Sequence, residues 1–299
     1  MGKTLGTLRR LPEIAYLSPK TLDEALSLLK KHKGEARALA GGTDLLPKMK
    51  RRDVAPKYLV DLKGIAGLNF IKYDKELGLR IGAATTLTEI LESHDIRKHC
   101  PILIEAVSRM ASTQIRNTGT IGGNLCNAVP SADTAPPLIA TGAQLKLVGS
   151  NGKVRTILAE DFFKGPNETV LGPVELLSEI QIPPAPYAGV GAYLKHTLRG
   201  EMDLAIVGVA AYLTVNSGKN ICKDIKIALG AVAPIPMRAK GAEEVLRGKP
   251  LGDDLIERAA EIASKESKPI DDIRGSAEYR REMVRVLTKR ALKKCLDKQ

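Results

Sequence analysis

Two glycine-rich segments constrain what this chain can fold into. The first is the turn 40–44, with the sequence Ala-Gly-Gly-Thr-Asp, and the second lies within 117–133 and contains Thr-Ile-Gly-Gly-Asn at 120–124. Glycines let a backbone pass close to a ligand, and successive N–H groups of such a turn point outward, which suits an anion. Two turns of this kind predict one diphosphate that is held from two sides.

The residues around the first turn alternate between strand and helix patterns. Ala36 to Ala40 predicts a buried strand, and Leu45 to Lys50 predicts a helix directly after the turn. A strand that feeds a glycine turn and then a helix N-terminus favours negative charge, because orphan N–H groups and the helix dipole act together. Upstream, Thr21 and Glu24 have the spacing of a capping box, which predicts a helix that begins there.

The rest of the chain predicts an α+β fold in two domains. Strand patterns occupy 69–73, 77–82, 144–148, 154–158 and 176–182, with a helix from Pro101 and a short helix that Asp133 can cap. The run Pro183-Pro184-Ala185-Pro186 is the predicted boundary between the domains. Beyond it we expect a three-stranded antiparallel sheet, with a turn at 216–218, followed by three helices. The predicted domains are 1–185, in lobes of about 1–65 and 66–185, and 189–299.

Composition and charge argue against several classes of protein. Aromatic residues make up 3% of the chain, and Trp is absent, which argues against single-stranded nucleic-acid binding because that uses aromatic platforms. The net charge of +12 is spread among interleaved acids and indicates either a solvated basic surface or a docking face. The longest apolar run, Leu204 to Leu213, is too short to span a membrane, and the N-terminal residues lack a secretory pattern.

The cysteines do not have the spacing of a metal site. Cys100, Cys126, Cys222 and Cys295 are far apart in the sequence, whereas zinc and iron–sulfur ligands come in close pairs. We therefore predict no metal site in this chain, and reduced thiols in a cytoplasmic protein.

The two glycine turns, taken together, resemble those of one family. The run Ala40-Gly-Gly-Thr-Asp-Leu-Leu46, the run Thr120-Ile-Gly-Gly-Asn-Leu125 and the Pro-x-x-Asp that ends at Asp133 are similar to the FAD-binding medium subunits of the molybdenum hydroxylases. This family includes xanthine dehydrogenase, aerobic carbon monoxide dehydrogenase and 4-hydroxybenzoyl-CoA reductase. The resemblance covers nearly the whole chain. It implies a two-lobed FAD-binding domain of the PCMH/VAO type and a C-terminal flavoprotein domain.

The resemblance also implies which residues hold a noncovalent FAD. The first turn would hold the diphosphate from one side and the second turn from the other, while Asp133 would contact the sugar or phosphate region. Asp203 and Lys240 lie where relatives bring polar groups toward the flavin, although either could be a surface charge. No catalytic residue is expected, and no histidine occupies the first turn to form a covalent link. The expected cofactor-binding residues are Ala40, Gly41, Gly42, Thr43, Asp44, Leu45, Thr120, Ile121, Gly122, Gly123, Asn124, Asp133, Asp203 and Lys240.

The implied function is electron transfer within a heterotrimeric oxidoreductase. A small subunit with [2Fe-2S] clusters would supply electrons, a large subunit would hold the molybdenum cofactor, and NAD, a quinone or oxygen would accept the electrons. The chain lacks the inserted iron–sulfur segment of the reductase branch, which argues for an ordinary hydroxylase subunit. The alternative is a free-standing FAD-dependent oxidase or reductase of the same two-lobed fold.

Overall fold

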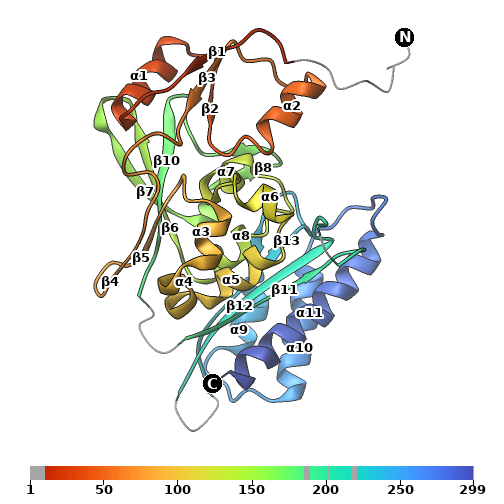
Figure 1. Ribbon diagram of the computed structural model, residues 1–299. Coiled ribbons are helices and arrows are strands. Elements are labelled where there is room, and N and C mark those ends of the chain that lie inside the picture. The colour runs from red at the N-terminus through yellow and green to blue at the C-terminus, as the bar shows by residue number, and fades with distance from the viewer. Residues whose placement is uncertain (1–10, 185–188, 201, 217–220, 299) are drawn as a thin grey trace.

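The computed structural model describes residues 11–184, 189–200, 202–216 and 221–298. It contains sheets of three, five and four strands, and a layer of short helices lies between the last two sheets (Figure 1). Part of the predicted boundary run 183–186 and most of the predicted turn 216–218 lie outside the described residues. In the part of the chain that is described, every helix is too short or too polar to cross a membrane.

The first sheet carries the first glycine turn. Its strands run parallel in the order β1-β3-β2, and Ala36 of β2 lies opposite Tyr58 of β3. Helix α1 buries Ala25, Leu26 and Leu29 on one face, in the cluster that includes this sheet. The predicted strand, turn and helix at 36–50 are confirmed. The elements are β1 (Ala15–Leu17), α1 (Leu22–Lys31), β2 (Ala36–Leu39), α2 (Leu45–Arg51) and β3 (Tyr58–Asp61).

The capping box predicted at Thr21 is only half formed. The Thr21 hydroxyl accepts a hydrogen bond from the Glu24 N–H, as expected for an N-cap. The second half of the prediction is wrong, because the Glu24 carboxylate accepts from the N–H of Lys20 at 2.8 Å instead. Helix α1 therefore keeps its N-cap, and the second hydrogen bond lies one residue outside the predicted box.

The second sheet is antiparallel, with the strand order β4-β5-β10-β6-β7. All five strands predicted between 69 and 182 are confirmed, with ends that differ by up to two residues. The hairpin between β6 and β7 turns through a short 3-10 helix at 150–152. The strands are β4 (Ile71–Asp74), β5 (Gly78–Gly82), β6 (Gln144–Gly149), β7 (Val154–Leu158) and β10 (Glu175–Ile182).

Short helices fill the space between the second and third sheets (Figure 1). Their buried faces form the largest core cluster, which includes Ile102, Leu103, Ile121 and Leu138. The second glycine segment is itself helical, whereas a turn is predicted there. These elements are α3 (Leu87–Glu92), α4 (His94–His99), α5 (Pro101–Ser108), α6 (Thr113–Arg116), α7 (Ile121–Asn127) and α8 (Ala135–Ala140), with the short strands β8 (Phe163–Gly165) and β9 (Glu168–Thr169).

The third sheet has one strand more than predicted. Its three long strands are confirmed as an antiparallel meander, and the two-residue strand β14 pairs with the end of β13. A strand of two residues leaves no alternating pattern in the sequence, so periodicity cannot reveal it. The C-terminal helices cover the face opposite α5 and α8 (Figure 1). The elements are β11 (Val190–His196), β12 (Val207–Asn216), β13 (Ile221–Gly230), β14 (Met237–Arg238), α9 (Lys240–Leu246), α10 (Asp253–Glu266) and α11 (Ala277–Asp297).

Candidate FAD site

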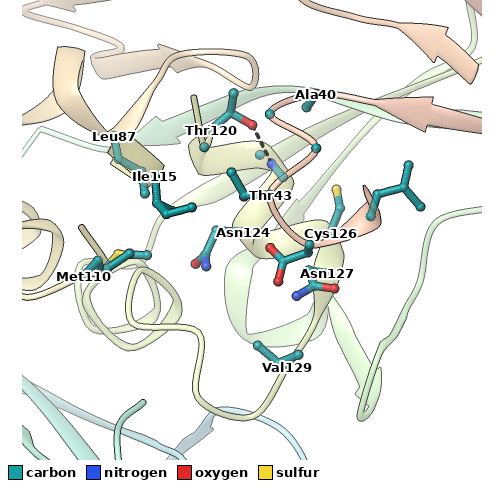
Figure 2. Close-up of a pocket in the computed structure, with 18 of the residues that line it drawn as sticks. Ala40, Thr43, Leu87, Met110, Ile115, Thr120, Asn124, Cys126, Asn127 and Val129 are labelled. Carbon is teal, nitrogen blue, oxygen red and sulfur yellow. Dashed lines mark hydrogen bonds between the residues drawn. The ribbon is translucent and has the colours of Figure 1, made fainter. Parts of the chain in front are cut away.

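A cavity of about 670 Å³ lies where the two glycine segments meet. The first sheet and α2 form one wall, α7 and the second sheet form others, and two loops of the C-terminal part close the remaining side. Figure 2 shows Asn124 of α7 near the middle of this space, between Met110 on one side and Asn127 on the other. The apolar lining includes Leu62, Leu68, Ala83, Ala84, Leu87, Met110, Ile115, Val129, Leu171, Leu176 and Leu177.

The first glycine turn presents its backbone donors without internal partners. Among the described residues, the N–H groups of Gly41, Gly42, Thr43 and Asp44 donate to no protein acceptor. Gly42 has a φ of +73°, a left-handed conformation that glycine adopts without strain. All four residues line the cavity. Successive unpaired N–H groups at one concave surface form an anion site, so the turn fits a diphosphate.

The second segment contributes side chains rather than the expected backbone donors. The N–H groups of Ile121 and Gly122 donate to Thr85 and Ala83, and the Gly123 N–H donates to the Thr120 hydroxyl at 3.0 Å (Figure 2). The second segment therefore does not offer the backbone donors that the sequence predicts for it. Because α7 begins at Ile121, the first N–H groups of the helix bind the neighbouring strand end and the N-cap.

Asn124 supplies a polar group of the second segment to the cavity. Its side-chain oxygen accepts from the Thr134 hydroxyl at 2.6 Å. With its oxygen toward Thr134, the amide leaves its NH2 group as the donor for other partners. In the described part of the chain the amide NH2 of Asn124 has no protein acceptor, and the side chain points into the cavity in Figure 2.

Asp133 joins the cavity to the C-terminal sheet. Its carboxylate forms a 2.8 Å ion pair with Lys195 and accepts a 2.7 Å hydrogen bond from the Tyr193 hydroxyl, both from β11. The side chains of Asp133 and Lys195 are 8% and 3% exposed. Burial raises the pKa of Asp133, and the Lys195 ammonium opposes that rise. Burial also raises the pKa of Tyr193, so its hydroxyl remains a donor at neutral pH.

The predicted capping role of Asp133 is wrong. Helix α8 has Thr134 at its N-cap, and no side chain there accepts from the first turn. The Asp133 carboxylate is instead held by Tyr193 and Lys195, which lie 60 and 62 positions later in the chain. A buried carboxylate is more strongly stabilised by a cation than by a helix N–H, so the ion pair determines its position.

Twelve of the fourteen residues predicted from the sequence line the cavity. The two others do not. Ile121, the first residue of α7, is fully buried in the core. Lys240 is 68% exposed at the start of α9, where its ammonium lies 3.8 Å from Glu160. Asp203 does line the cavity, but its carboxylate accepts from the N–H groups of Leu198, Arg199 and Leu204, which folds the loop.

Sequence reasoning missed four basic residues at the site. Lys48, Arg199 and Arg274 line the cavity, and Lys195 pairs with Asp133 from behind. Arg199 also pairs with Asp203 at 3.2 Å and, through a hydrogen bond, holds the pKa of that carboxyl below its usual value. The position of Lys48 after the first turn was a usable signal. The other three come from distant segments and left none.

Comparison with known proteins decides the family. A family model described as the FAD binding domain in molybdopterin dehydrogenase matches residues 12–185, and one described as the CO dehydrogenase flavoprotein C-terminal domain matches residues 192–295. The chain belongs to the FAD-binding medium subunits of the molybdenum hydroxylases. This medium subunit is therefore an FAD-binding component of a multi-subunit oxidoreductase, and the α+β fold implied by the resemblance is confirmed.

Individual relatives match the medium subunit over nearly its whole length. The glyceraldehyde dehydrogenase medium chain of Sulfolobus acidocaldarius is 37% identical over 282 residues, which is 94% of this chain and 98% of the relative. The xanthine dehydrogenase FAD-binding subunit of Escherichia coli O157:H7 is 33% identical over 93% of this chain and 94% of its own. A solved structure of carbon monoxide dehydrogenase from Hydrogenophaga pseudoflava superposes with a TM-score of 0.92 at 34% identity, over 96% of this chain and 99% of the other.

Proposed function

We propose that this medium subunit passes electrons from a [2Fe-2S] subunit to an external acceptor through noncovalent FAD. When bound, FAD supplies the redox chemistry, and the organic substrate is oxidised at a molybdenum cofactor in a large subunit. NAD, a quinone or oxygen is the acceptor in this proposal. The observation that carries it is the set of N–H groups at 41–44, which have no acceptor among the described residues. They line a cavity large enough for a dinucleotide in a chain of this family.

The proposed contacts divide the cavity into two regions. The N–H groups of 41–44 bind the diphosphate, and the amide of Asn124 donates to it from the opposite wall. The flavin ring lies toward Asp133, where the C-terminal sheet meets the cavity. The twelve lining residues of the predicted set form the proposed FAD site, and Ile121 and Lys240 are left out because neither lines the cavity.

In this proposal the residues of the medium subunit bind FAD and orient it. Asp133 and Lys195 form a neutral pair, so this wall offers the flavin polar atoms without net charge. The apolar lining excludes water from the ring. We assign no acid–base residue in this chain to the organic substrate, because oxidation of that substrate belongs to the large subunit in the proposal.

We further propose the domain division at 1–185 and 189–299 and a cytoplasmic location. The two family models end and begin at 185 and 192, which supports the division. The location rests on the unpaired pattern of the cysteines. The free-standing oxidase or reductase is set aside, because relatives matched over nearly the whole chain are medium chains or FAD-binding subunits.

Co-purification tests the proposed assembly. The subunit carrying an affinity tag is expressed in its native host and purified at low salt, and the eluate is analysed for FAD, iron and molybdenum. We expect two further chains, with iron and molybdenum present together with FAD. Recovery of the medium subunit alone with FAD, even at low salt, would contradict the heterotrimer. It would support the free-standing flavoprotein instead.

A further inference from the structure

Three basic side chains line the cavity, those of Lys48, Arg199 and Arg274. In the described part of the chain, the Lys48 ammonium forms no ion pair with a carboxylate. It donates to the side-chain oxygens of Asn127, at 2.6 Å, and Asn167, at 2.9 Å. By contrast, the guanidinium of Arg199 pairs with Asp203 and that of Arg274 with Asp272. A lysine held by two neutral amides keeps its whole charge available to a ligand.

The two asparagines are themselves fixed in place. Asn127 is the last residue of α7, where the helix dipole favours a cation. Asn167 lies in the turn between β8 and β9 with a φ of +61°, and its N–H donates to the Ala128 carbonyl at 2.8 Å. Asn127 and Asn167 thus hold the Lys48 ammonium at one position beside the cavity. These contacts offset the conformational entropy that ordering a long lysine side chain costs.

The position of Lys48 identifies the part of the ligand that it meets. It lies on α2, one helical turn after the first glycine turn, whereas Asp133, Arg199 and Asp203 mark the side near the C-terminal sheet. If the diphosphate lies at 41–44 and the flavin ring toward Asp133, the other half of the dinucleotide extends toward Lys48. Asn127, which binds Lys48, lies across the cavity from Met110 in Figure 2.

We infer that the Lys48 ammonium, positioned by Asn127 and Asn167, binds the AMP half of FAD and makes the site select FAD over FMN. This inference rests on the proposed FAD site. FMN carries a single phosphate and lacks the adenosine half, so it cannot span from the flavin pocket past the glycine turn to Lys48. The contact therefore contributes to FAD affinity and not to FMN affinity.

The test compares the dissociation constants of FAD and FMN for the apo-subunit, measured by flavin fluorescence. In Lys48→Met we expect FAD to bind about tenfold more weakly, the loss of one charge-assisted contact, while FMN affinity stays within about twofold. Lys50→Met is the matched control, because Lys50 is exposed on the same helix, and both affinities should remain those of wild type.

A second variant keeps the test decisive if Lys48→Met unfolds. Asn167→Asp preserves the shape and tolerates the positive φ, but it places a carboxylate on Lys48 and neutralises the ammonium. We expect the same selective loss of FAD affinity. Unchanged FAD affinity in both variants, or equal weakening of FAD and FMN, would overturn the inference and leave Lys48 a structural tie. A wild-type subunit that binds neither flavin would instead contradict the proposed FAD site.

Discussion

Gly41 packs directly against the carbonyl of Thr118. A Cβ on Gly41 would lie 2.3 Å from the Thr118 oxygen and 2.7 Å from the Cα of Gly119. The first glycine turn is therefore pressed against the loop that leads into the second segment. Only a residue without a side chain allows this approach, and the approach brings the unpaired N–H groups of the first turn to the same cavity as α7.

Gly41→Ala should disrupt both stability and FAD binding. The added methyl meets backbone atoms that cannot rotate away, so the two segments must separate. We expect a loss of about 1–3 kcal/mol in the free energy of unfolding, as for overpacked cores, and FAD affinity that falls at least about tenfold. Urea unfolding and flavin titration measure the two effects. Gly64→Ala is the control, because a Cβ at Gly64 meets nothing within 4 Å, and wild-type behaviour in Gly41→Ala would contradict the close packing.

Thr120→Val should weaken the start of α7. The substitution removes the oxygen that accepts from the Gly123 N–H and leaves that donor without its cap. We expect the free energy of unfolding to fall by about 1 kcal/mol, the usual contribution of an N-cap. Thr120→Ser keeps the hydroxyl and should lie close to wild type. Equal stabilities for the Val and Ser variants in urea unfolding would show that the cap contributes nothing.

Asp133→Asn should be among the most destabilising single changes at the site. It leaves the buried Lys195 ammonium without its carboxylate, which costs about 3–5 kcal/mol when a buried ion pair is broken. The double variant Asp133→Asn with Lys195→Met removes both charges and should recover part of the loss. Asp53→Asn is the comparison, because the Arg51–Asp53 pair has the same 2.8 Å distance on the surface and should matter by less than about 1 kcal/mol. Similar losses for both single variants would contradict the role of burial.

Glu105 should make stability depend on pH in the acid range. Burial alone raises its pKa, but hydrogen bonds from Lys298 and Lys294 outweigh burial and hold the pKa below the ordinary value of 4.5. A carboxyl whose pKa is lowered on folding stabilises the native state above its unfolded pKa, and this contribution disappears as the pH falls through the folded pKa. The stability difference between wild type and Glu105→Gln should therefore be largest above the ordinary pKa and shrink below it. A difference that is constant between pH values on either side of 4.5 would contradict the lowered pKa.

Local signals in the sequence were sufficient for most of the fold. The strand before Gly41 and the helix after Asp44 depend on residues within a few positions of one another, and the structure has both. The helix at 121–127 escaped prediction because two glycines and two asparagines disfavour helix, and burial of Ile121 and Leu125 overrides that preference.

Contacts between distant segments could not be predicted from the chain alone. Nothing in the sequence near Asp133 indicates that Lys195 and Tyr193 will reach it, because their meeting depends on how β11 packs against α5. The same is true of Lys48 and Asn167. Family resemblance identified the residues of the glycine segments. It did not reveal that the second segment uses its N–H groups internally.

The flavin content of the purified medium subunit tests the proposed FAD site most directly. The visible absorption spectrum is recorded before and after acid precipitation, with FAD added first if none co-purifies. We expect flavin bands, close to one FAD per chain, and release of all the flavin into the acid supernatant. A subunit that remains without flavin after FAD is added would contradict the FAD site, and flavin that stays with the precipitate would contradict noncovalent binding.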